Sequence, residues 1–162
     1  MKPICVQTEG GVAASAGTHL EAGTYPDANG NEQSYSACID FSVNQLATRL
    51  CDGAQVPMNA ARIYWMLEHF AEFGFCAWYR TPDEGFSASH IHIVCAMVPI
   101  KLPIVQHQVL DFVTGRNGLK SHATEAFYTP SSDYDSAIAQ AFIDANPNAL
   151  PAYLAALKAV AG

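Results

Sequence analysis

The amino-acid sequence predicts an α+β fold in which a small antiparallel sheet packs with helices. Residues 75–81 and 89–97 are rich in aromatic and β-branched residues, and a Pro-Asp-Glu-Gly turn at 82–85 lies between them. Such a short connection cannot make the crossover that two parallel strands need, so these strands are expected to form a hairpin. Helical patterns lie before and after the hairpin, and this order favours the α+β class.

The composition is that of one globular domain, which we expect to span residues 1–162. Half of the residues are apolar and 14% are charged, whereas disordered chains combine low hydrophobicity with high net charge. Acidic residues outnumber basic ones by 15 to 8, and Lys and Arg form no cluster, which argues against nucleic-acid binding. No apolar run approaches the ~20 residues of a membrane-spanning helix, so no membrane insertion is expected.

The first half of the chain is expected to form a loop, a strand and a helix. Residues 7–37 are rich in Gly, Ala, Ser, Thr and Asn, which predicts a long loop of a kind that is often functional. Residues 38–43 alternate apolar and polar side chains, and this predicts a strand with one face of each kind. Behind Pro57, apolar residues recur at helical spacing over residues 58–74.

Three helices are expected after the hairpin, at 103–114, 132–145 and 150–160. The last two form the C-terminal helical part of the domain, from about residue 132. The five cysteines are odd in number and widely spaced, without a Cys-x-x-Cys pair. Small buried thiols are therefore expected, and a disulfide framework is not.

Two histidines at alternating positions point to a metal site on the sheet. If residues 89–97 form a strand, His90 and His92 leave it on the same face, while Ile91 and Ile93 enter the core. Neutral imidazole is the commonest metal ligand in proteins. A pair of surface histidines on an exposed face is the alternative, and this feature alone does not separate the two.

Asp40 and His19 complete a possible donor set for a metal ion. Asp40 lies on the polar face of its predicted strand, beside Ser42, and His19 ends the loop segment SAGTH. Two histidines and one aspartate are as many protein ligands as a catalytic zinc requires, since its fourth position stays open for water. Taken singly, a solvent-facing residue is the simpler interpretation of Asp40 and of His19.

In combination these motifs resemble the zinc peptidases of the D-alanyl-D-alanine carboxypeptidase and hedgehog type. That family carries a Ser-x-Gly-Thr-His segment, an Asp-Leu-Ser-like strand and a late His-x-His. Their counterparts here are SAGTH ending at His19, DFSV beginning at Asp40, and HIH at 90–92. The segments GFCAWYRTPDEGF and QHQVLDFVTGRNGL are similar to those of phage and actinobacterial members. The resemblance covers roughly residues 15–120.

The resemblance implies a zinc ion bound by His19, Asp40 and His92, with His90 as a catalytic residue that is not a ligand. His19 and Asp40 are 21 positions apart, farther than in the family, which implies an inserted loop between them. Many relatives also have a glutamate three residues before a histidine, where this chain has serine. Asp83 and Glu84, in the hairpin turn, are then the candidates for the general base, and a solvated turn is the alternative.

The resemblance further implies hydrolysis of peptidoglycan stem peptides, by a D-Ala-D-Ala carboxypeptidase or by an endopeptidase of the endolysin type. Arg80 is expected to bind a substrate carboxylate, because a planar guanidinium binds carboxylates in bidentate fashion, and a plain surface arginine is the alternative. Ser42 is expected to contact the substrate. The N-terminal apolar stretch is shorter than a signal-peptide core, so we expect the protein to be made in the cytoplasm. The resemblance implies that it acts on the cell wall or in the virion. We also expect a monomer. The alternative is a non-catalytic phage structural or binding module with the same fold and a degenerate metal site.

Overall fold

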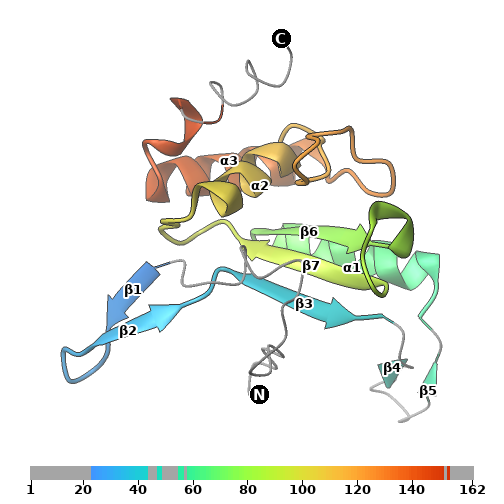
Figure 1. Cartoon of the computed structure of the whole chain (residues 1–162), viewed down its shortest axis with the longest axis horizontal. Coiled ribbons are helices and arrows are strands. Elements are labelled where there is room, and N and C mark those ends of the chain that lie inside the picture. Colours follow the sequence, from blue (N-terminus) through green and yellow to red (C-terminus); the bar gives the residue numbers. More distant parts are fainter. Residues whose placement is uncertain (1–22, 44–46, 49–54, 57, 152, 154–162) are drawn as a thin grey trace.

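The computed structural model describes residues 23–43, 47–48, 55–56, 58–151 and 153. Within these residues it combines α-helices with small antiparallel sheets (Figure 1), which confirms the predicted α+β class. No helix in the described part of the chain is both long and apolar enough to cross a bilayer.

A three-stranded antiparallel sheet forms the centre of the molecule. Its strand order is β3 (Cys38–Ser42), β7 (His90–Cys95) and β6 (Phe75–Arg80), so β7 pairs with a neighbour on each side. These strands were expected at 38–43, 89–97 and 75–81, and the predicted hairpin of the last two is confirmed. The turn between them contains a short 3-10 helix, η1 (Pro82–Glu84).

The sheet has one apolar and one mainly polar face because side chains alternate along each strand. Ile91 of β7 lies opposite Phe41 of β3 and Tyr79 of β6, so these three residues share the apolar face. His92 lies opposite Asp40 and Trp78 on the other face. A slip of one residue would exchange the two sets, so burial of the isoleucines specifies the register.

Helix α1 (Ala60–Glu72) covers the apolar face of the sheet. It begins where the side chain of Asn59 accepts a hydrogen bond of 3.0 Å from the backbone N–H of Arg62. The Phe70 ring lies 5.8 Å from that of Phe41 and 6.4 Å from that of Phe75, measured between ring centroids. The helix was expected over 58–74, and its apolar stripe is the surface that packs on the sheet.

Helix α2 (Pro103–Phe112) lies over the opposite face. Phe112 at its end meets Trp78 of the sheet edge to face, with ring centroids 5.2 Å apart. Helix α3 (Ser132–Ala145) contacts both α1 and α2 and completes the core (Figure 1). Both helices were expected. Residues 149–151 and 153 are also helical, and the rest of the helix expected at 150–160 lies outside the described residues.

The expected long loop at 7–37 contains a β-hairpin instead, formed by β1 (Gly23–Pro26) and β2 (Glu32–Tyr35). Its turn is closed by Asp27, whose carboxylate accepts hydrogen bonds from the backbone N–H groups of Asn29 and Asn31. Most residues of both strands are exposed, so no apolar alternation reveals them in the sequence. A second short pair, β4 (Ala47–Thr48) with β5 (Gln55–Val56), was not predicted either.

We expect Ile138→Ala to lower the free energy of unfolding by about 2–5 kcal/mol, because the deletion leaves a cavity beneath α3. Ile138 is 1% exposed, whereas Ile143 on the same helix is 37% exposed. Ile143→Ala is therefore the matched control, with an expected loss below about 1 kcal/mol. Urea unfolding followed by circular dichroism measures both changes, and equal losses would contradict the packing of α3 described above.

Candidate functional site

A cavity of about 460 Å³ lies between the polar face of the sheet, helix α2 and the loop that follows α2. It is lined by histidines, charged side chains and apolar groups: Arg80, Phe86, His90, His92, Ile104, His107, Gln108, Asp111, Gly118, Leu119, Lys120 and His122. Four of the six histidines of the chain thus border one cavity. Its size is typical of small-molecule and peptide subsites, which run from about 300 to 1,000 Å³.

His92, on the sheet wall of this cavity, forms a hydrogen-bonded pair with Asp40. They are direct neighbours in the register of β3 and β7, and Oδ1 of Asp40 lies 2.8 Å from Nδ1 of His92. Nε2 of His92 lies 3.3 Å from Oε1 of Gln108 on α2. His92 is buried, and its two ring nitrogens are contacted by Asp40 of the sheet and by Gln108 of the helix.

His90 lies one pleat away from His92 and also lines the cavity. Its Nδ1 lies 2.9 Å from the carbonyl oxygen of Ala88, and its ring meets Phe86 edge to face. A carbonyl only accepts, so Nδ1 carries the proton in this contact and neutral His90 keeps a lone pair on Nε2. The structure therefore brings Asp40, His90 and His92 together. His19 lies outside the described residues.

Arg80 is 1% exposed and is held by four groups at the edge of the cavity. Nη1 donates to Oε1 of Glu84 at 3.2 Å, and Nη2 donates to the carbonyl of Asn117 at 2.5 Å. The guanidinium also lies over the rings of Trp78 and Phe86, at 5.2 and 5.8 Å from their centroids. Burial lowers the pKa of Arg80, and the nearby carboxylate of Glu84 opposes that shift.

The other predicted site residues lie around the turn at η1 and at the end of β3. Glu84 accepts from Arg80 and, through its second oxygen, from the backbone N–H of Thr81 at 3.0 Å. Asp83 is exposed, and neither acid is among the residues that line the cavity. Ser42 lies opposite His90 in the register of β3 and β7. The roles expected for these residues in catalysis and substrate binding stay predictions.

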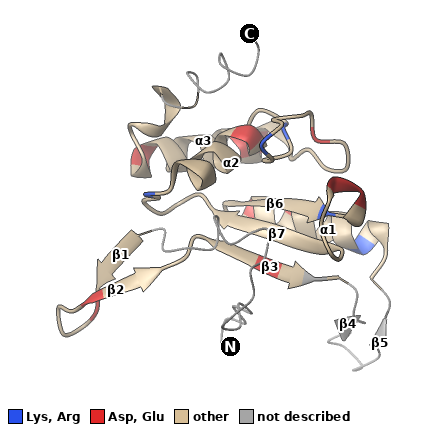
Figure 2. Ribbon diagram, viewed as in Figure 1, with Lys and Arg blue, Asp and Glu red and all other residues tan. Residues whose placement is uncertain are grey.

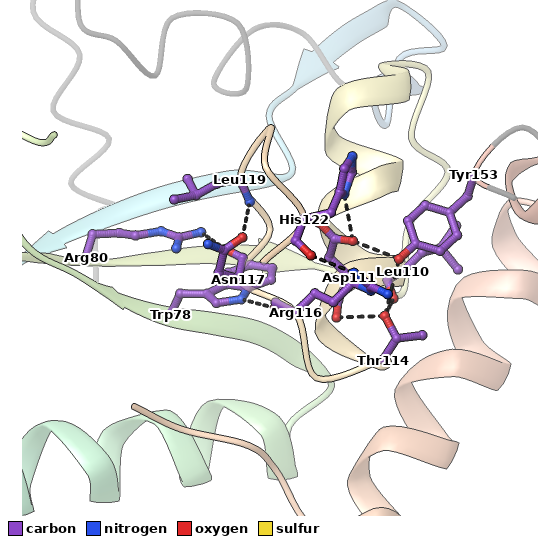
Figure 3. Close-up of polar contacts among 10 residues, drawn as sticks. All are labelled: Trp78, Arg80, Leu110, Asp111, Thr114, Arg116, Asn117, Leu119, His122 and Tyr153. Carbon is purple, nitrogen blue, oxygen red and sulfur yellow. Dashed lines mark hydrogen bonds and ion pairs between the residues drawn. The ribbon is translucent and has the colours of Figure 1, made fainter. Parts of the chain in front are cut away.

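The loop at 113–122 is fixed to the polar face of the sheet by two side chains (Figure 3). The indole N–H of Trp78 donates to the carbonyl of Arg116 at 3.1 Å, and Arg80 donates to Asn117. Gly118 has φ +65°, and a Cβ at this position would lie 2.9 Å from the Trp78 ring. The left-handed backbone and the close approach together require glycine here, so that the loop can pass over the sheet.

A second histidine–aspartate pair, which the sequence did not reveal, lies at the end of α2. Nδ1 of His122 lies 2.8 Å from Oδ2 and 2.9 Å from Oδ1 of Asp111. Tyr153 donates to Oδ1 of the same carboxylate at 2.7 Å (Figure 3). His122 and Asp111 are 11 positions apart and belong to no short motif, so only the path of the loop brings them together.

His107, one turn before Asp111 on α2, lies beside this pair. Its ring centroid is 6.3 Å from that of His122 and 5.7 Å from that of Tyr153. Burial lowers the pKa of His107, and the nearby His122 lowers it further, while Asp111 acts in the opposite direction. The neutral form of His107 is therefore favoured in the folded protein.

The charges of the described residues are dispersed, with acidic side chains on several helices and strands (Figure 2). The cavity nevertheless contains two cationic side chains, Arg80 and Lys120, together with the carboxylate of Asp111. A ligand with both a carboxylate and polar amide groups would find donors and acceptors in this lining. Comparisons with protein-family models, curated proteins and solved structures give no match for this chain.

We expect the free energy of unfolding to fall as the pH drops below about 6.5, the ordinary pKa of histidine. Because the folded protein holds the pKa of His107 below that value, the unfolded chain takes up the proton first. His107→Gln removes this contribution and should reduce the fall between about pH 7.5 and pH 5 in urea unfolding. His69→Gln, outside the cavity, controls for loss of any histidine. An unchanged fall in His107→Gln would count against the assignment.

Proposed function

We propose that this protein is a zinc-dependent peptidase that hydrolyses peptidoglycan stem peptides. The observation that carries the proposal is the placement of Asp40, His90 and His92 on one sheet face, where both histidines line a 460 Å³ cavity and Asp40 lies opposite His92. These are three of the residues to which the resemblance gives the metal site and the catalytic group. Their strands are set by a hydrophobic register, so the grouping does not depend on loop conformation.

Asp40 and His92 carry donor types that zinc accepts, a carboxylate oxygen and an imidazole nitrogen. Oδ1 of Asp40 and Nδ1 of His92 are 2.8 Å apart, so the two donors already lie side by side. If Nε2 of His92 carries the proton and donates it in a hydrogen bond to Gln108, the lone pair of Nδ1 points to Asp40. A hydrogen-bond acceptor on the second nitrogen, as Gln108 would be, is usual for a metal-binding histidine.

His19 would be the third protein ligand. Among the residues that the structure describes, which do not include His19, no group of three His, Cys, Asp or Glu side chains has the geometry of a metal site. Of the three proposed ligands, the structure describes two, Asp40 and His92, and these two lie side by side on the sheet. The proposal thus depends on His19, and its ligand role can be tested directly.

A bound zinc would polarise the scissile carbonyl and lower the pKa of a water molecule at the open position. The chain's own residues would then position the peptide and move protons. His90 lines the same cavity and keeps a lone pair on Nε2, where it can accept a proton and later pass it on. Lys120 is a cation in the cavity lining that could meet the carboxylate of a stem peptide.

We expect the purified protein to bind close to one zinc per chain, and His19→Ala and His92→Ala to lose most of it, because each removes a ligand. Elemental analysis after dialysis against zinc and removal of excess metal measures the content. His69→Ala, on helix α1 and outside the cavity lining, is the matched control and should bind as the wild type does. Wild-type protein that stays free of zinc would overturn the metal assignment.

We expect His90→Ala to keep its zinc but to lose about 10²–10⁴-fold of its activity on purified sacculi, the usual contribution of an acid–base group. Mass spectrometry of the products distinguishes the two specificities, since a carboxypeptidase releases free D-alanine and an endopeptidase opens cross-links. A zinc-loaded wild-type protein that releases neither product would favour the non-catalytic module. Wild-type activity in His90→Ala would contradict the role of His90 alone.

A further inference from the structure

We propose that His122, oriented by Asp111, is a second acid–base catalyst that faces the same cavity from the wall formed by α2 and its loop. The inference rests on the proposed function and adds to it the group that accepts the proton of the attacking water. Nothing in the sequence motifs points to His122. Its assignment comes from its place in the cavity lining and from its contact with Asp111 (Figure 3).

The hydrogen bonds fix which nitrogen of His122 carries the proton. Asp111 is 1% exposed, and both of its oxygens lie within 2.9 Å of Nδ1 of His122. A carboxylate accepts the Nδ1 proton, so Nε2 of the neutral imidazole is left with its lone pair. No hydrogen bond to that Nε2 is found within the described residues, and the His122 side chain lines the cavity. This is the orientation that a general base requires.

Tyr153 and Thr114 hold the carboxylate in place. The Tyr153 hydroxyl donates to Oδ1 of Asp111 at 2.7 Å and lies 3.2 Å from the hydroxyl of Thr114. Burial raises the pKa of Tyr153 to about 12, so the phenol stays protonated and continues to donate. Asp111 is thus a positioning residue whose carboxylate accepts from two donors, Nδ1 of His122 and the hydroxyl of Tyr153.

The backbone at His122 is also specialised. Its φ is +49°, the one positive value at a non-glycine residue in the described part of the chain. The backbone N–H donates to Leu119 at 2.9 Å, and the carbonyl accepts from Nη1 of Arg116 at 2.6 Å. A left-handed conformation at a residue with a Cβ costs roughly 1–2 kcal/mol and is maintained only by such surroundings. Glycine would avoid this cost but would leave Asp111 without its imidazole.

The other acids near the site are engaged or lie outside the cavity. Glu84 has one oxygen on Arg80 and the other on a backbone N–H, and Asp83 is exposed away from the lining. Besides Asp111, the charged or titratable groups near His122 are His107 on α2, Tyr153, and Lys120 and Arg116 of its own loop. Of these, only the His122–Asp111 pair combines a bare ring nitrogen with a fixed carboxylate.

The proposed step conserves protons and electrons. As the water oxygen forms a bond to the scissile carbonyl carbon, the π electron pair moves onto the carbonyl oxygen, and the water proton passes to Nε2 of His122. The electron pair on that oxygen then re-forms the C=O bond as the C–N bond breaks, and the C–N pair stays on the leaving nitrogen, which takes the proton from Nε2. His122 returns to its starting form, and Asp111 stays ionised throughout.

His122→Asn is the sharpest test. The asparagine amide nitrogen occupies the place of Nδ1 and can still donate to Asp111, and asparagine tolerates the left-handed backbone. The variant therefore lacks only the Nε2 side of the ring. We expect zinc content and thermal stability to match the wild type, while kcat on a stem peptide falls by about 10²–10⁴-fold and KM changes little. His69→Asn is the matched control and should keep wild-type activity.

A second measurement does not depend on turnover. Nitrogen-15 NMR of the zinc-loaded protein should show His122 protonated at Nδ1 and bare at Nε2, and Asp111→Asn should shift the proton to Nε2 and lower kcat. An active wild type with an equally active His122→Asn would overturn this inference and leave the proposed function intact. A zinc-loaded wild type that cleaves no stem peptide would overturn both. A proton on Nε2 in the wild type would also exclude His122 as the base.

Discussion

The antiparallel register of β3, β7 and β6 is the constraint on which the rest of the molecule depends. It is specified by apolar side chains such as Ile91 and Ile93, which are buried on the face that helix α1 covers. The same register places Asp40 beside His92 and Trp78 on the opposite face. Hydrophobic burial on one face therefore also fixes the residue pairs of the candidate site, since a shift of the strand register would change the neighbours on both faces at once.

The buried guanidinium of Arg80 links this sheet to the loop at 113–122. A charged group in the interior needs partners for its donors, and the partners here are Glu84 from η1 and the carbonyl of Asn117 from the loop. The indole of Trp78 adds a neighbouring attachment point. The two walls of the cavity are consequently joined by side chains of a single strand, which keeps His122 at a fixed place relative to the histidines of β7.

The sequence was sufficient to predict the central strands and the helices because their periodicity reflects burial on one side. It was not sufficient for the hairpin at 23–35, whose exposed strands have no apolar alternation to read. The meeting of Asp40 and His92 could be anticipated in part, since both were placed on polar faces of strands and the family resemblance assigned both to one metal site. The pairing of β3 with β7, which brings them together, was not predicted. The pair of His122 and Asp111 could not be anticipated, because it depends on the path of the loop at 113–122. That path is set by tertiary contacts, such as the hydrogen bond from Trp78 to Arg116, which no local sequence pattern reveals.

The positions of the two tryptophans give the protein an optical property of its own. Trp65 is 60% exposed and stacks on His69 with ring centroids 3.9 Å apart, whereas Trp78 is 1% exposed and lies 5.9 Å from the ring of His92. A buried indole emits at shorter wavelengths than one in water, and a soluble quencher such as iodide reaches only the exposed ring. An imidazole close to an indole quenches its fluorescence more strongly when it is charged. The short-wavelength emission, which comes from Trp78, therefore depends on the charge of His92 in the cavity wall.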